Sequence, residues 1–198
     1  DLRNHIYSDF NYMNTNDLGC IEFSGRYPGN LVEEINNYSI VAGVIARTIP
    51  CDIIHSHDWL TYPAGIHAKQ VTGKPLVIHV HATDFDRSRG NVNPTVFNIE
   101  KDGMNNADHI ITVSNLTRRT VIEKYGISPD KVTTVHNAVE PLSEELLNVT
   151  VPPKHDKVVT FLGRITMQKG PEYFVEAAAQ VLSKVRGVQF VMAGGGDM

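Results

Sequence analysis

The chain has 198 residues, 41% of them hydrophobic and 20% charged, a balance typical of a globular protein and not of a disordered one. Its 18 Lys and Arg against 22 Asp and Glu give a net charge of −4, so charge gives no reason to expect nucleic acid or an anionic membrane surface as a partner. No apolar run approaches the roughly 18 residues of a membrane span. The two cysteines, Cys20 and Cys51, are too few for a disulfide scaffold and predict ordinary thiols in a reducing, cytoplasmic compartment.

The spacing of apolar residues predicts an alternation of helices and short strands after a turn-rich stretch of about 30 residues. Helices are expected over 31–49, 63–71, 95–107, 115–125 and 172–185, and strands over 52–57, 76–81, 109–114, 132–135, 158–162 and 189–193. Asn115 is the expected cap of its helix, and residues 82–93 are expected to form a polar loop. This alternation predicts an α/β fold with a parallel sheet and helices on both of its faces.

The composition divides the chain into two domains. Residues 1–140 form the expected amino-terminal domain, and the proline-bracketed segment 141–156 the expected linker. Residues 157–198 hold only one β-α-β unit, which is too small to bury a core of its own. We therefore expect a truncated second domain, and the start at Asp1 and the end at Met198 suggest that both ends are cut.

Polar residues follow the predicted strands, where parallel sheets bind their ligands. They occur as His55 to Asp58, His79 to Asp84, Ser114 with Asn115, and His136 with Asn137. His55 and His57 share one face of their strand, so a metal is geometrically possible there. No third ligand stands at a recognisable spacing, and the sequence predicts no metal site.

The segment from Phe161 to Gly170 combines a strand end, a glycine, two cations and the start of a helix. Gly163 lets a ligand approach the backbone, while Arg164 and Lys169 bring positive charge to the amino end of that helix. A diphosphate would fit this arrangement. The alternative is a solvated pair of charges in a loop.

This segment resembles the donor-diphosphate loop G-R-x(4)-K-G of retaining glycosyltransferases of family 4, a group that includes bacterial glycogen synthases. Other motifs of that family occur in order: His55-Ser-His-Asp-Trp59 for H-x-H-D-W, Val80-His81, Ala107 to Ser114 for A-D-x-(I/V)-(I/V)-x-V-S, His136-Asn-Ala-Val139, and Ala193-Gly-Gly-Gly196 for A-G-x-G. The run from His81 to Arg87 is most similar to a glycogen-synthase-like subgroup.

The resemblance implies a GT-B fold, in which two Rossmann-like domains face each other across a cleft. The amino domain of the family mostly holds the acceptor, and the carboxy domain mostly holds a UDP- or ADP-sugar donor. No cofactor or metal is implied, since Arg and Lys replace a cation at the diphosphate. Relative to the family, this chain lacks the first strand with its glycine-rich loop, and all of the second domain beyond its first β-α-β unit, including the E-x(7)-E segment.

Residue roles carry over by position. Arg164 and Lys169 match the pair that stabilises the leaving diphosphate, and Gly163 and Gly194 match donor-side glycines. His81 matches a histidine that reaches the transferred sugar near its anomeric centre; the alternative is a hydrogen-bonded core histidine.

Three further residues have a structural alternative beside the functional one. Asp58 matches an acid needed for activity, and it is also placed to cap the helical segment that opens near Thr61. Asp84 and Arg87 are expected either to contact the acceptor or to form a salt-bridged loop. Leu60 stands where many glycogen synthases carry a polar residue, which bears on the identity of the acceptor.

The sequence therefore predicts the central part of a retaining glycosyltransferase that moves a hexosyl unit, glucosyl first of all, onto a glycan. The 198-residue chain alone is expected to be inactive or nearly so. A sugar-nucleotide 2-epimerase of the same fold is one alternative, against which the G-R-x(4)-K-G and H-x-H-D-W motifs argue. A non-catalytic module that self-associates through its incomplete second domain is the other.

Overall fold

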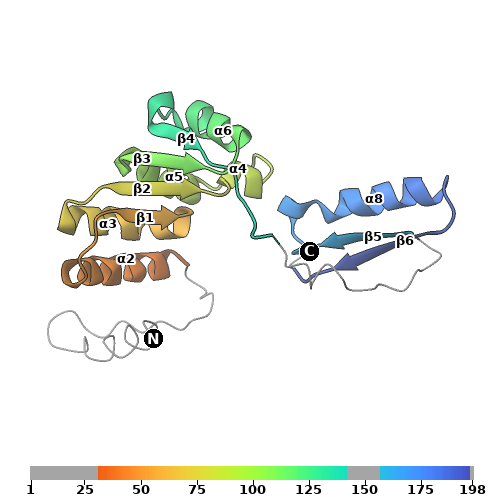
Figure 1. The fold of residues 1–198 in the computed structure, drawn as a ribbon, viewed down its shortest axis with the longest axis horizontal. Coiled ribbons are helices and arrows are strands. Elements are labelled where there is room, and N and C mark those ends of the chain that lie inside the picture. The colour runs from red at the N-terminus through yellow and green to blue at the C-terminus, as the bar shows by residue number, and fades with distance from the viewer. Residues whose placement is uncertain (1–30, 142–156, 197–198) are drawn as a thin grey trace.

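A computed structural model describes residues 31–141 and 157–196 of the chain (Figure 1). The first range contains α2 (Leu31–Thr48), β1 (Ile54–His57), η1 (Trp59–Thr61), α3 (Tyr62–Thr72), β2 (Leu76–Val80), α4 (Asp84–Arg87), α5 (Pro94–Asn106), β3 (His109–Thr112), α6 (Asn115–Tyr125), η2 (Pro129–Lys131) and β4 (Val132–Thr134). The second contains β5 (Lys157–Leu162), η3 (Met167–Lys169), α8 (Pro171–Leu182) and β6 (Val188–Ala193). Every predicted helix and strand of these ranges is present, with ends shifted by a few residues. The predicted linker lies outside the described residues except for Pro141, as does the turn-rich start of the chain.

All strand pairs in the described ranges are parallel, which confirms the α/β class. Strands β1 to β4 form one sheet in sequence order, and β5 pairs with β6 in a second sheet. Ile78 of β2 stands between Ser56 of β1 and Ile110 of β3. Consecutive parallel neighbours require a crossover through a helix, and α3, α5 and α6 provide these connections.

The core of the first region lies on one face of its sheet. Side chains from α3, α5 and α6 join strand residues in a single buried cluster, whose most buried members are Tyr62, Leu76, Ile78, Val80, Met104, Ile110 and Val121. Helices were expected on both faces, but these three helices share one face. The physical reason is the strand order: β1 to β4 lie side by side in sequence order, and right-handed crossovers between such parallel strands place every connecting helix on the same face.

Two local predictions were wrong. The segment 82–93 is not only loop, because Thr83 opens the short helix α4. Asp86 Oδ2 accepts hydrogen bonds from the Thr83 backbone N–H (2.7 Å) and from Thr83 Oγ1 (2.9 Å), which is half of a capping box. Ser114 and not Asn115 caps α6: Ser114 still has an extended backbone, and its Oγ accepts from the Thr117 N–H at 3.0 Å.

Helices α3 and α5 approach closely at Gly103. A Cβ atom built there would lie 2.4 Å from Cδ2 of Tyr62, a side chain that is 1% exposed. Glycine inside a helix costs about 1 kcal/mol relative to alanine, and here that cost is offset by the packing of the tyrosine ring against the helix backbone.

Candidate functional site

The loops that follow β1 and β2 are tied together at the carboxyl edge of the sheet. Asp58 Oδ1 accepts a hydrogen bond from the backbone N–H of His81 at 2.9 Å, and the Asp58 N–H donates to the carbonyl of His79 at 3.0 Å. Asp58 has φ 59° and ψ 164°, a conformation that costs a non-glycine residue roughly 1–3 kcal/mol. Its side chain makes no capping hydrogen bond to η1, so the expected cap role is wrong. The carboxylate instead holds the backbone of the predicted sugar-contacting histidine.

Arg87 links this edge to the buried interior. Its Nη1 donates to Glu100 Oε1 at 2.9 Å and its Nη2 donates to the carbonyl of Ala82 at 2.8 Å. Nη2 also lies 3.7 Å from Asp58 Oδ1. The side chain of Arg87 therefore bridges two carboxylates, Asp58 from the loop after β1 and Glu100 from helix α5.

Glu100 is the buried member of this network, and it is 1% exposed. Its Oε2 accepts from the Tyr125 hydroxyl and, at 3.2 Å, from the Asp84 N–H. Burial raises the pKa of Glu100, and these two hydrogen bonds together with the Arg87 guanidinium oppose that rise. Sequence reasoning did not single out Glu100, because a lone glutamate on a helix is ordinarily a surface residue.

Asp84 and Arg87 were expected to serve either the acceptor or a salt-bridged loop. Asp84 is 7% exposed, and its Oδ2 accepts from the Asn93 N–H at 2.6 Å. Together with the ion pair between Arg87 and Glu100, this hydrogen bond makes Asp84 and Arg87 part of a salt-bridged segment, which is the structural alternative. Their contact with an acceptor stays a prediction.

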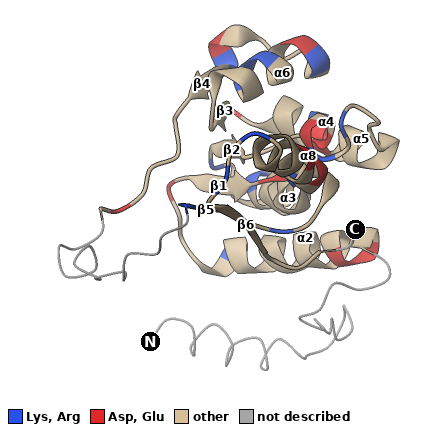
Figure 2. Cartoon of the chain, turned by 90° about the vertical axis from the view of Figure 1, so that its right-hand side faces the viewer, with Lys and Arg blue, Asp and Glu red and all other residues tan. Residues whose placement is uncertain are grey.

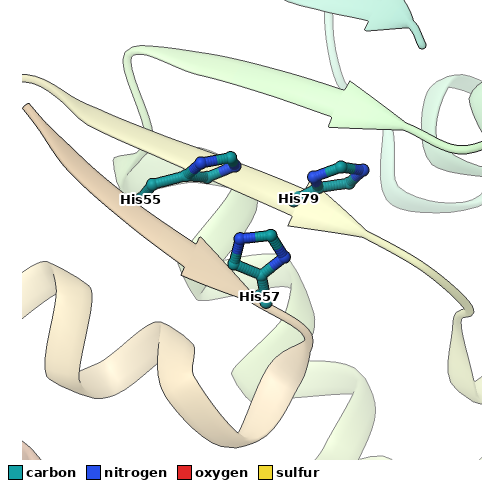
Figure 3. Close-up of side chains that lie close together, drawn as sticks. All are labelled: His55, His57 and His79. Atoms are coloured by element: carbon teal, nitrogen blue, oxygen red, sulfur yellow. The ribbon is translucent and has the colours of Figure 1, made fainter. Parts of the chain in front are cut away.

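A cluster of four imidazoles stands on the other face of the same strands, and Figure 3 draws three of them, His55, His57 and His79. His55 and His57 come from β1, His79 from β2 and His81 from the residue after it. His57 Nδ1 and His81 Nε2 are 3.0 Å apart, within hydrogen-bond distance. Burial, followed by the neighbouring imidazoles, lowers the pKa of His55 and of His79, which favours their neutral form. The strand register brings these rings together, and spacing along the sequence does not reveal it.

In the second region, two glycine-bearing loops lie against each other. The Gly163 N–H donates to the carbonyl of Ala193 at 3.0 Å, and the Ile165 N–H donates to that of Gly195 at 2.9 Å. A Cβ atom built on Gly194 would lie 1.8 Å from the Gly163 carbonyl oxygen. Only glycine at position 194 permits this approach, which fixes the course of the loop after β5.

Arg164 and Lys169 belong to this loop, and both are exposed. The ion pairs found in the described ranges are Lys69–Asp108, Arg87–Asp58, Arg87–Glu100 and Arg89–Glu172, none of which includes them. Lys169 ends η3, two residues before α8 begins at Pro171. Two cations beside the amino end of a helix provide a favourable position for an anion.

Arg89 joins the two regions, and sequence reasoning missed it. Its guanidinium donates to the carbonyl of Met167 at 2.8 Å, forms an ion pair with Glu172 and lies 5.2 Å from the centre of the Tyr173 ring. These contacts bring the loop after α4 beside the start of α8 (Figure 2). No sequence signal connects residues so far apart along the chain.

No helix within residues 31–141 and 157–196 has both the length and the apolar character that crossing a membrane would require.

Solved structures with the same arrangement define the class of protein. Sucrose-phosphate synthase from Thermosynechococcus elongatus superposes with a TM-score of 0.66 at 19% identity, over 92% of this chain and 45% of that one. HepE of Anabaena, in complex with UDP and glucose, gives a TM-score of 0.62 at 18% identity, over 85% of this chain and 46% of that one. These are GT-B glycosyltransferases, and the likeness shows that the chain has part of a GT-B fold.

The sequence identifies the family. Residues 26–141 match the model of Glycosyltransferase Family 4, and the chain belongs to that family. An uncharacterized glycosyltransferase of Methanocaldococcus jannaschii is 30% identical over 160 residues, covering 74% of this chain and 41% of the relative. D-inositol 3-phosphate glycosyltransferase 1 of Catenulispora acidiphila is 28% identical over 153 residues, covering 71% and 37%. The chain thus spans less than half the length of these relatives.

Proposed function

We propose that this chain supplies the central part of a retaining glycosyltransferase that moves a hexosyl unit, glucosyl in the first instance, from a UDP- or ADP-sugar to a glycan acceptor. The observation that carries the proposal is the pair Arg164 and Lys169, which is held on a glycine-shaped loop at the start of α8 and is outside every ion pair of the described ranges. Such a pair is available to a diphosphate.

The proposed chemistry needs charge stabilisation where the donor bond breaks. As the glycosidic bond to the diphosphate opens, negative charge grows on the leaving oxygen, and Arg164 and Lys169 stabilise it. His81, held through its backbone by Asp58, faces the transferred sugar from the other domain. The acceptor hydroxyl attacks the face of the sugar from which the diphosphate leaves, and its proton passes to the leaving diphosphate oxygen.

The test is binding of UDP to the 198-residue chain, followed by NMR or calorimetry. We expect Arg164→Ala and Lys169→Ala each to weaken binding about 10-fold or more, because a hydrogen bond to a charged group contributes roughly 1.5–3 kcal/mol. Lys184→Ala is the matched control, since Lys184 is an exposed cation of the same region. If Arg164→Ala bound UDP as tightly as the unaltered chain, the proposed donor site would be contradicted.

Turnover is a separate question. Release of UDP or ADP from the corresponding glucose donors by this chain should stay far below about 1 per second, a low value for an enzyme, since the chain spans less than half the length of its relatives. Product analysis separates transfer from epimerisation, because transfer lengthens a glycan and epimerisation yields a new sugar nucleotide. The cytoplasmic location stays a prediction.

One observation favours the self-associating alternative. Large apolar side chains of the second region are exposed, among them Leu162 at 83%, Tyr173 at 62% and Val175 at 55%. Exposed apolar groups of this size seek a partner surface. Sedimentation at two concentrations decides the matter: mass that grows with concentration supports a second copy as partner, and a strictly monomeric chain excludes it.

A further inference from the structure

Three histidines from two strands meet on the face of the first sheet opposite its core. His55 and His57 are two residues apart in β1 and therefore point to the same side. His57 stands directly opposite His79 of β2 in the parallel register, so the third imidazole comes from the neighbouring strand. The intervening Ser56 and Ile78 point into the core, where both are buried.

The three rings converge within the reach of a single ion (Figure 3). One nitrogen from each ring can be chosen so that all three lie within 4.8 Å of one another. The ring centres are separated by 4.3 Å between His55 and His57, 5.0 Å between His57 and His79, and 5.5 Å between His55 and His79.

The ring of His79 carries the strongest sign of a missing ligand. Both of its nitrogens are buried, and neither has a hydrogen-bond partner in the part of the chain that the structure describes. Buried polar atoms in folded proteins are nearly always paired, and each that is not paired calls for an explanation such as an ion. A metal on one nitrogen would supply the missing partner.

We propose that His55, His57 and His79 bind a divalent transition-metal ion of the zinc class. Neutral imidazoles suit zinc, copper and nickel, whereas calcium and magnesium require oxygen ligands. Zinc–nitrogen bonds of about 2.0–2.1 Å place the ligand nitrogens of a tetrahedron about 3.3 Å apart. Small rotations of three partly exposed rings close the remaining distance. A triad of imidazoles leaves the fourth position of the tetrahedron for water or another ligand.

This site touches the proposed catalytic edge without being part of it. Since Nδ1 of His57 faces His81 Nε2 at 3.0 Å, Nε2 is the nitrogen of His57 that remains for a metal. Metal binding there fixes the proton on Nδ1, so that His57 donates to His81. An occupied site would thus set the tautomer of His81. The proposal goes beyond sugar transfer and does not depend on it.

The experiment is a titration of the untagged, metal-stripped 198-residue chain with ZnCl₂ by calorimetry, and with CoCl₂ by visible spectroscopy. We expect one equivalent of Zn²⁺ to bind, and Co²⁺ to give the intense bands of a four-coordinate site. His55→Gln and His79→Gln should each weaken Zn²⁺ binding by more than about 100-fold, since even the loss of an outer partner costs roughly 10–100-fold.

The matched control is His109→Gln. His109 lies on the same face of the next strand, and its Nε2 pairs with Thr133 Oγ1 at 2.9 Å, so it is a histidine of similar setting outside the triad. Unchanged zinc affinity in this variant supports the site. Zinc binding that is absent from the unaltered chain, that survives His79→Gln, or that falls equally in His109→Gln overturns it. Circular dichroism of His55→Gln, a substitution at an exposed ring, shows whether the fold is intact.

Discussion

In both regions of the chain the backbone is sterically constrained just after a strand ends, and the two regions place different residues at that point. After β1 the chain places Asp58 at φ 59°, and its carboxylate holds the backbone N–H of His81. After β6 it places Gly194, whose missing side chain lets the loop come against the carbonyl of Gly163. The first region accepts backbone strain to keep a carboxylate in place, and the second omits a side chain to bring two loops together.

The same contrast extends to the functional groups. In the first region, Arg87 forms ion pairs with both Asp58 and Glu100, so these side chains are positioned before any ligand arrives. In the second, main-chain packing sets the course of the loop, and Arg164 and Lys169 extend from it outside the ion pairs of the described ranges. The paired side chains of the first region are held in place before a ligand binds. The two cations of the second region, which stand outside those ion pairs, remain available to pair with a charged ligand.

The largest effect is expected from breaking the buried network. Glu100→Ala removes the acceptor for the Tyr125 hydroxyl and the partner of Arg87, and should lower the free energy of unfolding of the first region by about 3–5 kcal/mol. Urea unfolding followed by circular dichroism measures it. Glu123→Ala is the control, because Glu123 is exposed on α6 and should change stability by less than about 0.5 kcal/mol. An equal loss of unfolding free energy in the two variants would show that the buried network does not stabilise the fold.

The corresponding test in the second region concerns its glycines. Gly194→Ala introduces a Cβ atom 1.8 Å from a backbone oxygen and should destabilise the loop pair by about 1–3 kcal/mol. Gly195→Ala meets nothing within 4 Å and should be neutral. Hydrogen exchange of the Gly163 and Ile165 amides reports the difference, with faster exchange in the first variant only. Exchange that rises in both would contradict the assigned close approach.

A smaller effect should separate two substitutions at Asp58. Asp58→Gly and Asp58→Ala both lose the carboxylate, and only the glycine variant relieves the strain of φ 59°. The glycine variant should therefore be the more stable by about 1 kcal/mol, against the usual preference for alanine. Thermal unfolding of the two proteins under one set of conditions gives the comparison. If the alanine variant were as stable as the glycine variant or more so, the backbone at position 58 would not be strained.

The smallest effect involves an exposed pair and pH. Hydrogen bonds from Lys69 and from the Leu76 N–H hold the pKa of Asp108 below its ordinary value of 3.8. The stabilisation is complete above that pH and is lost as the pH falls through the lowered pKa of the folded state. Asp108→Asn should cost about 0.2–1 kcal/mol at neutral pH and flatten the acid limb of the stability curve. Asp130→Asn, at an exposed carboxyl, should leave that limb as steep as before.

Much of the fold could be predicted from the sequence because apolar spacing reports which side of an element is buried. The strands Leu76–Val80 and His109–Thr112 were recognisable in this way. The one-turn helix α4 was missed because four residues carry no periodicity, although Thr83 and Asp86 form a capping signal. The one-sided packing of the helices was also missed, since alternation shows that a face is buried but not which helix covers it.

The candidate site, too, could be predicted from the sequence only in part. Asp58 and His81 were predicted at one sheet edge, and the structure places them within one hydrogen bond of each other. Glu100 and Arg89 were not predicted, because their partners lie far away in sequence and only packing brings them near. His79 was recognised as a polar residue at a strand end, but its position opposite His57 was not predicted, because strand register and not spacing along the sequence sets it there.

The contact between Gly103 and Tyr62 has an evolutionary consequence. Because a Cβ atom at position 103 would lie 2.4 Å from the tyrosine ring, position 103 cannot gain a side chain while tyrosine stands at position 62. A lineage that acquires alanine at 103 must first, or at once, shrink the side chain at 62, and a lineage that keeps tyrosine is bound to glycine across the helix pair. Among chains that retain this crossing of α3 and α5, tyrosine at position 62 should occur only together with glycine at position 103.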